Sequence, residues 1–238
     1  MAYWFVKIIL TPILRIAYRV RVEGREHLPR SGAVILAANH RSFLDSIFIP
    51  MVLRRRVTFV AKAEYFDDPK TAWFFRAVGQ IPIRREGGSA SDGALAAATD
   101  VLNGGGVFGI YPEGTRTRDG LLHKGKTGVA RLALATGAPI VPVGLVGTDE
   151  CQPTDAKLPR LFRKVTIRFG PPLSMAHYVG RERDRLVLRQ ITDELMFEIG
   201  ELSGYEYRDT YASKSDAPGG HDFPDASTVV ARLESAAS

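Results

Sequence analysis

Three uninterrupted apolar runs constrain the fold of this 238-residue chain more than any other feature of its sequence. They cover residues 33–38, 107–111 and 140–146. Short runs without polar alternation are typical of strands that are buried on both faces. Such strands occur mainly in parallel sheets whose two faces are both covered by helices. We therefore expect the chain to fold around a sheet of this kind.

Segments with helical character separate these strands along the chain. Residues 89–103 are rich in alanine and run into Gly104, and residues 128–136 run into Gly137, as helix C-termini commonly do. The alternation predicts an α/β fold with a mixed, mostly parallel sheet flanked by helices. The expected strands are residues 20–24, 33–38, 57–61, 81–83, 107–111, 140–146 and 165–170, and the expected helices are residues 43–53, 69–78, 89–103, 128–136 and 181–202.

The first twenty residues are expected to form a helix that lies in the membrane interface. Their apolar and aromatic residues are interrupted by Lys7, Arg15 and Arg19. Three charges argue against a simple membrane span, and the absence of a small-residue cleavage site argues against a signal peptide. Apolar residues with a basic rim suit an interfacial helix, which Pro12 is expected to kink or divide. An ordinary amphipathic helix that packs on the domain is the alternative.

The rest of the chain is expected to form one domain and a tail. Residues 21–202 hold the predicted strands and helices, ending in a long amphipathic helix. After Ser203 the composition shifts to Ser, Asp, Pro and Gly, which bury little surface. We therefore expect an anchoring helix over residues 1–20, one domain over residues 21–202 and a flexible C-terminal tail over residues 203–238.

The formal net charge of +6 favours a partner that carries negative charge, such as an anionic membrane surface or a phosphorylated substrate. Nucleic-acid binding is not expected, because the basic residues are dispersed and no recognition motif accompanies them. The single cysteine, Cys151, excludes an internal disulfide. We interpret Cys151 as a small neutral residue rather than a nucleophile, because no histidine lies near it in sequence.

The most informative polar stretch follows the strand expected at residues 33–38 and contains His40 and Asp45. A histidine is a natural general base for activating a hydroxyl, and a carboxylate can hold its ring in one tautomer. On a regular helix, positions five apart diverge by about 140°, so the two side chains meet only if His40 precedes the helix. The alternative is that Asp45 only caps a helix whose N-cap is Ser42, and that His40 satisfies the loop backbone.

Further polar residues follow the ends of other expected strands. Ligands of such sheets gather at the carboxyl ends of the strands, and arginine pairs with phosphate oxygens in a bidentate manner. Each group alone is equally consistent with a solvated loop. Their joint placement predicts one anion-binding site, in which a glutamate accepts hydrogen bonds from substrate hydroxyls. The candidate substrate-binding residues are Arg84, Arg85, Glu113, Gly114, Thr115, Arg116 and Lys124.

Four blocks, in order, resemble the PlsC-type glycerolipid acyltransferase family, which includes the 1-acylglycerol-3-phosphate acyltransferases. Residues 39–45 resemble its HxxxxD motif, residues 79–85 its second block, residues 113–116 its EGTR motif and residues 140–143 its fourth block. HxxxxD alone is a weak signal, but four ordered blocks are specific. The resemblance covers about residues 20–175. Pro82 departs from the bulky residue often found in the second block, which leaves the exact acceptor open.

The resemblance implies an enzyme that transfers a fatty acyl group from a thioester, either acyl-CoA or acyl carrier protein, to a hydroxyl of lysophosphatidate, forming phosphatidate. It implies that His40 takes the proton of that hydroxyl with the help of Asp45, and that Arg85 and the EGTR residues hold the glycerol phosphate. It implies no metal or other cofactor.

Together with the first helix, the resemblance suggests a peripheral or monotopic protein on the cytoplasmic face of the cell membrane. The alternatives are glycerol-3-phosphate or another lysolipid as the acceptor, and a non-catalytic phospholipid-binding protein.

Overall fold

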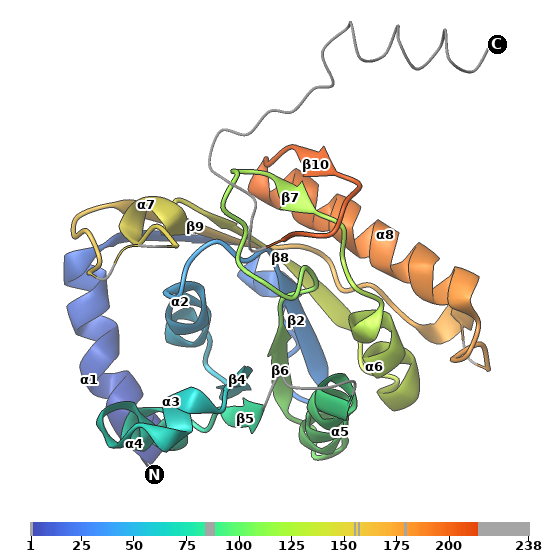
Figure 1. Cartoon of the computed structure of the whole chain (residues 1–238), viewed down its shortest axis with the longest axis horizontal. Helices are drawn as coiled ribbons and strands as arrows, with labels where there is room; N and C mark the ends of the chain where they lie inside the picture. The colour runs from blue at the N-terminus through green and yellow to red at the C-terminus, as the bar shows by residue number, and fades with distance from the viewer. Residues whose placement is uncertain (1, 84–88, 155, 157, 179, 214–238) are drawn as a thin grey trace, which may run out of the picture.

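A single six-stranded sheet forms the centre of the computed structural model, which describes residues 2–83, 89–154, 156, 158–178 and 180–213 (Figure 1). The strand order is β1-β9-β8-β2-β6-β3. Every neighbouring pair in this sheet is parallel except β8 and β9. The expected α/β fold with a mixed, mostly parallel sheet is thereby confirmed. The strands are β1 (Arg19–Glu23), β2 (Val34–Ala38), β3 (Val57–Thr58), β6 (Val107–Ile110), β8 (Ile140–Val146) and β9 (Lys164–Phe169).

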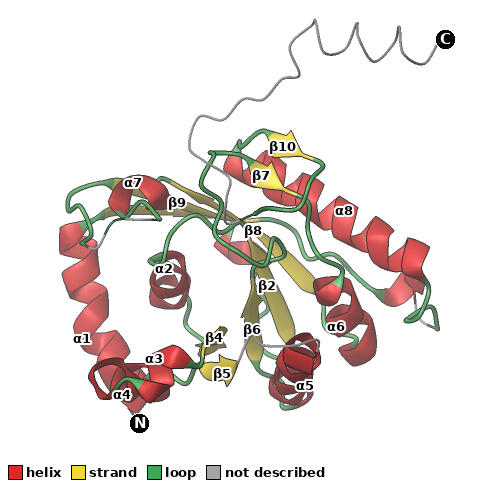
Figure 2. Cartoon of the chain, in the orientation of Figure 1, coloured by secondary structure: helices red, strands yellow, loops and turns green. Residues whose placement is uncertain are grey.

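Helices cover both faces of this sheet (Figure 2). All residues of β2 are buried, and successive side chains enter different cores. Leu36 packs in the core that includes residues of α1 and α2, whereas Ile35 packs in the core that includes residues of α5, α6 and α8. The uninterrupted apolar run therefore reflects two cores. The helices are α1 (Ala2–Ala17), α2 (Asp45–Val52), α3 (Glu64–Asp67), α4 (Pro69–Ala77), α5 (Ser89–Asn103), α6 (Gly128–Thr136), α7 (Thr148–Cys151) and α8 (Arg185–Ser203), with 3-10 turns at Arg25–His27 and Ala176–Tyr178.

The strand expected at residues 57–61 is divided at Phe59. The N–H of Phe59 donates to Gln80 Oε1 (2.8 Å), and its carbonyl accepts the N–H of Ile81 (3.0 Å). These two bonds turn the chain out of the main sheet and into a small parallel sheet of β4 (Val60–Lys62) and β5 (Ile81–Ile83).

The long helix α8 begins at Arg185 rather than at residue 181. The side chain of Asp184 accepts the N–H groups of two residues in the first turn (2.9 and 3.3 Å), which fixes the start of the helix there.

Helix α1 runs through Pro12 without being divided. Proline cannot donate to the carbonyl of Ile8, but Ile8 lies on the exposed side of the helix, where water can satisfy that carbonyl. The opposite side packs on the domain through Tyr3 and Leu14. Among the helices of the described residues, none has the length and apolar character needed to cross a bilayer.

Contacts with the domain continue past residue 202, where the tail was expected to start. Strand β10 (Tyr207–Arg208) pairs in parallel with β7 (Leu122–His123). The carbonyl of Thr210 also accepts the N–H of Lys124 (3.0 Å). The residues just after α8 are thus joined to the loop that follows β6. The division into residues 1–20, 21–202 and 203–238 stays a prediction.

Candidate active site

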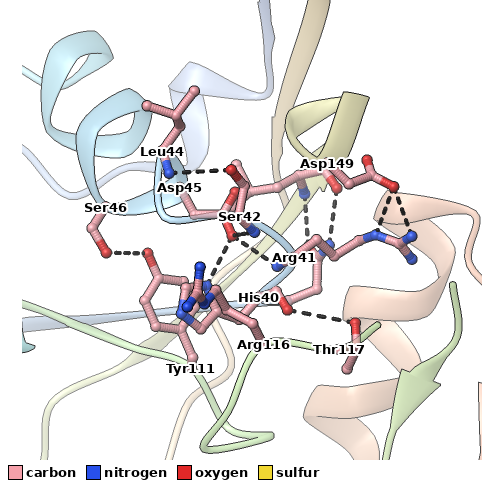
Figure 3. A network of polar contacts seen from close by, with 12 residues as sticks. His40, Arg41, Ser42, Leu44, Asp45, Ser46, Tyr111, Arg116, Thr117 and Asp149 are labelled. Atoms are coloured by element: carbon pink, nitrogen blue, oxygen red, sulfur yellow. Dashed lines mark hydrogen bonds and ion pairs between the residues drawn. The ribbon is translucent and has the colours of Figure 1, made fainter. Parts of the chain in front are cut away.

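His40 and Asp45 meet between the end of β2 and the start of α2 (Figure 3). His40 precedes the helix, as the five-residue spacing requires, and its Nδ1 lies 2.9 Å from Asp45 Oδ2. The same oxygen accepts the N–H groups of Arg41 and Ser42, each at 2.8 Å. These bonds hold residues 40–44 in a turn, so α2 begins at Asp45 rather than at residue 43. Asp45 therefore holds the turn and orients the imidazole at once.

The hydrogen bonds at Asp45 also indicate which nitrogen of His40 is basic. Because Oδ2 already accepts two backbone N–H groups, the bond to Nδ1 carries the proton of the histidine. In the neutral ring Nε2 is then the acceptor nitrogen, and it makes no hydrogen bond within the described part of the chain. The His40 side chain is 17% exposed and lines the main cavity, while Asp45 is fully buried. One basic nitrogen is thus left open to a ligand.

The loop after β6 holds the backbone of His40 at both its N–H and its carbonyl. Glu113 Oε2 accepts the His40 N–H (3.1 Å), and the Thr117 N–H donates to the His40 carbonyl (2.9 Å). Glu113 Oε1 accepts the N–H of His123 (2.9 Å). Glu113 is 1% exposed and is not among the residues that line the cavity beside His40, which does not favour the expected role of accepting substrate hydroxyls. Burial raises the pKa of the Glu113 carboxyl to about 7, against the opposing effects of the two N–H groups and the charge of Arg41.

His40 lines a cavity of about 960 Å³. Its walls come from α1, α2 and α4 on one side and from the loop after β6 on the other. This volume is at the upper end of the range for small-molecule sites and suits a ligand with a long apolar part. The apolar lining includes Val6, Leu10, Ile47, Met51, Phe74 and Phe75.

Cations from the loop after β6 line the same cavity. Arg116 and Arg118 do so together with Thr115, and Arg116 also donates to the carbonyl of Thr154 (3.5 Å). Gly114 adopts a φ of +76°, and a Cβ there would lie 3.0 Å from Lys126 Nζ. Gly114 therefore gives Lys126 room to lie against the cavity.

Lys124 was expected to bind substrate, but it is not among the residues that line the cavity. Its Nζ pairs with Asp209 (2.8 Å), and this ion pair raises the pKa of Lys124. Lys126, two residues later, lines the cavity instead. Arg84 and Arg85 lie outside the described residues, although Ile83, which precedes them, lines the cavity.

The family model described as Acyltransferase matches residues 19–146, which is more than half of the chain. The chain belongs to the acyltransferase family. It is 33% identical to the chloroplastic 1-acyl-sn-glycerol-3-phosphate acyltransferase LPAT1 of Arabidopsis thaliana over 59% of this chain and 39% of that protein. It is 28% identical to the 1-acyl-sn-glycerol-3-phosphate acyltransferase of Bacillus subtilis over 84% of this chain and 96% of that protein.

A solved structure supports the same relationship. The 1-acyl-sn-glycerophosphate acyltransferase PlsC of Thermotoga maritima superposes with a TM-score of 0.62 and 27% identity, covering 81% of this chain and 76% of that chain. The chain spans 39% and 41% of the two chloroplastic relatives from Arabidopsis thaliana and Brassica napus.

The candidate site includes an aromatic stack that the sequence pattern did not indicate. The ring of Tyr111 lies face to face with the His40 imidazole, with centroids 3.8 Å apart and planes at 9°. The Phe59 ring also stacks on Tyr111, with centroids 5.4 Å apart, and Tyr111 Oη is 2.8 Å from Ser46 Oγ. A Cβ at Gly109 would lie 2.2 Å from the Phe59 ring, so glycine is required there. An aromatic residue directly before Pro112-Glu113 was the only sequence signal.

The neighbours of His40 in sequence fix its loop to other elements. The side-chain amide of Asn39 donates to the carbonyl of Leu145 (2.9 Å) and accepts its N–H (2.8 Å), which joins the end of β2 to β8. The guanidinium of Arg41 pairs with Asp149 (2.7 and 3.1 Å) and lies over the Tyr205 ring at 4.2 Å. In the sequence, the position of Asn39 and Arg41 next to His40 is the signal that marks them as residues of the candidate site.

Cys151 is buried in α7, and burial raises the pKa of its thiol to about 12. A thiol with such a pKa is not ionised at neutral pH, which agrees with the interpretation of Cys151 as a neutral residue. Among the described residues, no group of three or more His, Cys, Asp or Glu side chains is placed to hold a metal ion. That the enzyme needs no cofactor stays a prediction.

Proposed function

We propose that this acyltransferase transfers a fatty acyl group from an acyl thioester to the free hydroxyl of lysophosphatidate, forming phosphatidate in phospholipid synthesis. One observation carries the proposal: His40, whose Nδ1 lies 2.9 Å from Asp45 Oδ2, lines a cavity that has cations in one wall and apolar side chains in another. The names of the relatives from Arabidopsis thaliana, Bacillus subtilis and Thermotoga maritima support the same acceptor.

The proposed chemistry needs one base and one transferred proton. His40 Nε2 removes the proton from the acceptor hydroxyl while the hydroxyl oxygen attacks the thioester carbonyl carbon. Asp45 keeps the proton on Nδ1 and stabilises the imidazolium that forms. The tetrahedral intermediate collapses with cleavage of the carbon–sulfur bond, and the leaving thiolate takes the proton from Nε2. The ester forms, the thiol is released, and His40 returns to its starting state.

Binding of the acceptor is proposed at the wall that carries Arg116, Arg118 and Lys126. Arginine forks match phosphate oxygens, and a lysine adds a point charge. Arg84 and Arg85 stay candidates for the same phosphate. The acyl chain would lie against the apolar side chains of α1, α2 and α4. The donor is proposed to be acyl-CoA or acyl carrier protein, with no metal or other cofactor.

The protein is proposed to act as a peripheral enzyme on the cytoplasmic face of the membrane. Exposed apolar residues along one side of α1 support this location, because lysophosphatidate resides in the membrane.

Thiol release measured with purified protein tests the proposed function. Acyl-CoA and acyl carrier protein thioesters are each supplied with lysophosphatidate, with glycerol-3-phosphate or with no acceptor. We expect release with lysophosphatidate, and His40→Ala should abolish it while leaving lysophosphatidate binding intact. Thiol release with glycerol-3-phosphate but not with lysophosphatidate would show that glycerol-3-phosphate is the acceptor. If the protein binds lysophosphatidate but no phosphorylated glycerol acceptor supports thiol release, the proposed enzymatic function is refuted.

A further inference from the structure

Two segments that are far apart in sequence lie side by side at one edge of the sheet. Helix α1 leads into β1 and residues 158–163 lead into β9, and these strands are parallel neighbours. The N–H of Phe162 donates to the carbonyl of Ala17, the last residue of α1 (2.7 Å), and the N–H of Arg19 donates to the carbonyl of Arg163 (3.0 Å). The loop therefore continues the surface of α1 at the C-terminal end of that helix.

Both segments expose large apolar side chains. In the loop, Leu158 is 80% exposed and Phe162 is 70% exposed. Phe162 also has a φ of +61°, a left-handed conformation that is unusual for a bulky residue. Strain of this kind is typically retained at functional positions. The exposed apolar residues of the two segments are Trp4, Phe5, Ile8, Ile9, Ile13 and Ile16 in α1 and Leu158, Leu161 and Phe162 in the loop.

The net positive charge of the chain is carried by the same two segments. Residues 2–19 and 158–164 contain Lys7, Arg15, Arg19, Arg160, Arg163 and Lys164 and no acidic residue. The chain has 32 basic and 26 acidic residues, so 26 of each remain outside these segments and cancel. Lys7 lines the cavity and donates to the carbonyl of Leu53, whereas the other five cations are exposed, like the apolar residues of these segments. This combination is typical of surfaces that contact anionic lipid.

We infer that the outward side of α1 and the loop of residues 158–164 form one docking face for an anionic bilayer, with the loop as a second contact beside the helix. The inference names the partner of the site described above and rests on the proposed function. The inner side of α1 lines the cavity through Val6, Leu10 and Leu14. On this docking face the helix lies between the bilayer and the cavity.

Vesicle co-sedimentation of the full chain tests the docking face. The vesicles are phosphatidylcholine with or without about one-third phosphatidylglycerol. We expect Leu158→Gln with Phe162→Gln to lower the partition coefficient about 10-fold or more, because two apolar side chains no longer enter the bilayer. Arg160→Gln with Arg163→Gln should lower binding to anionic vesicles about fivefold for each charge and leave binding to neutral vesicles unchanged.

A matched control lies on α8, across the sheet from α1 (Figure 1). Leu186 is 80% exposed and Phe197 is 65% exposed, so Leu186→Gln with Phe197→Gln removes the same residue types from another surface. The control variant should bind vesicles as the unchanged protein does. Equal loss in the two double variants, or no loss in the loop variant, would overturn the inference.

Turnover with a short-chain, monomeric lysophosphatidate separates this inference from the proposed function. We expect the loop variant to keep the turnover of the unchanged protein on that dissolved substrate. Vesicle binding without turnover would refute the function and leave the docking face standing. Turnover without a preference for anionic vesicles would support the function and refute the docking face.

Discussion

Two histidines in this protein each face an aspartate, and they differ in how many ring nitrogens are occupied. His40 bonds Asp45 through Nδ1 and leaves Nε2 open to the cavity. The ring of His123 is 1% exposed, with Nε2 at 3.0 and 3.1 Å from the oxygens of Asp119 and Nδ1 at 3.2 Å from the carbonyl of Thr210. The first pair therefore has a ring nitrogen that a ligand in the cavity could contact. The second joins the loop after β6 to the segment after α8.

One buried carboxylate connects the two histidines. Glu113 accepts the backbone N–H of His40 on one oxygen and that of His123 on the other. The residue that looked like a substrate ligand therefore joins the backbone of the His40 loop to that of β7. The comparison teaches that two His–Asp pairs in one fold can differ in whether a ring nitrogen stays accessible, which a base requires.

Asp45→Asn is expected to give the largest loss of turnover. The amide oxygen can still accept the N–H groups of Arg41 and Ser42, so the turn persists, but the amide no longer fixes the tautomer of His40 or stabilises its charge. We expect kcat to fall about 10²- to 10⁴-fold in the thiol-release assay. A kcat within threefold of the unchanged enzyme would show that the pair is not catalytic.

Tyr111→Leu is expected to lower kcat about 2- to 30-fold while KM stays constant. The ring face of Tyr111 lies against an imidazole that becomes positively charged during the reaction, and cation–π contacts contribute about 0.5–2 kcal/mol. Tyr111→Phe keeps the ring and loses only the contact with Ser46, so its kcat should stay close to normal. Equal losses in both variants would assign the effect to the hydroxyl instead.

Glu113→Gln is expected to lower kcat about 2- to 10-fold, because an amide can accept only one of the two N–H groups that the carboxylate accepts. The variant also tests a pH effect. Burial raises the pKa of Glu113 from 4.5 to about 7, so the folded protein binds the extra proton more tightly than the unfolded chain. Stability from this group is full below about pH 4.5 and is lost as the pH rises through about 7.

Urea midpoints at several pH values measure that effect of Glu113. The decline in midpoint between pH 4.5 and pH 7 in the unchanged protein should be reduced in Glu113→Gln. If the urea midpoint changes equally with pH in the two proteins, the pKa of this carboxyl is not raised.

His123→Gln is expected to have the smallest effect on turnover, within about threefold, and to destabilise the fold by about 1–3 kcal/mol through lost buried hydrogen bonds. Burial alone would raise the pKa of Asp119, but the N–H of Leu121 and the neighbouring His123 outweigh burial and lower it. Stability from Asp119 is therefore present above its usual pKa of 3.8 and is lost as the pH falls through the lower folded value.

Urea unfolding of His123→Gln near neutral pH and near pH 3 checks both parts. The difference in urea midpoint between the variant and the unchanged protein should be smaller near pH 3 than near neutral pH. A large loss of turnover with an unchanged urea midpoint would make His123 a second functional histidine.

Sequence patterns predicted most of the fold because the main sheet is buried on both faces. Runs such as residues 33–38 and 140–146 are apolar throughout for that reason, and their strands were placed within one residue. Strand β10 was missed because its pairing with β7 depends on backbone contacts between distant residues and needs no apolar pattern. The division at Phe59 depends on the side chain of Gln80, which local propensity does not reveal.

The candidate site was predictable where chemistry depends on local spacing, and less so where it depends on contacts between loops. His40 and Asp45 are five residues apart, so they could meet only if His40 preceded the helix, and the structure contains that turn. Glu113 was expected to face substrate. Its residue type and position do not reveal that its carboxylate accepts two backbone N–H groups inside the protein. Lys124 and Lys126 lie in the same loop, and only the pairing with Asp209 separates them.

Carbethoxylation followed by peptide mass spectrometry tests the difference between the two histidines most directly. Samples are taken over time, and the modified fraction of each histidine is compared with the remaining rate of thiol release. We expect turnover to fall in proportion to modification of His40, lysophosphatidate to slow that modification, and His123 to stay unmodified at half-inactivation. Full turnover after complete modification of His40 would contradict the account.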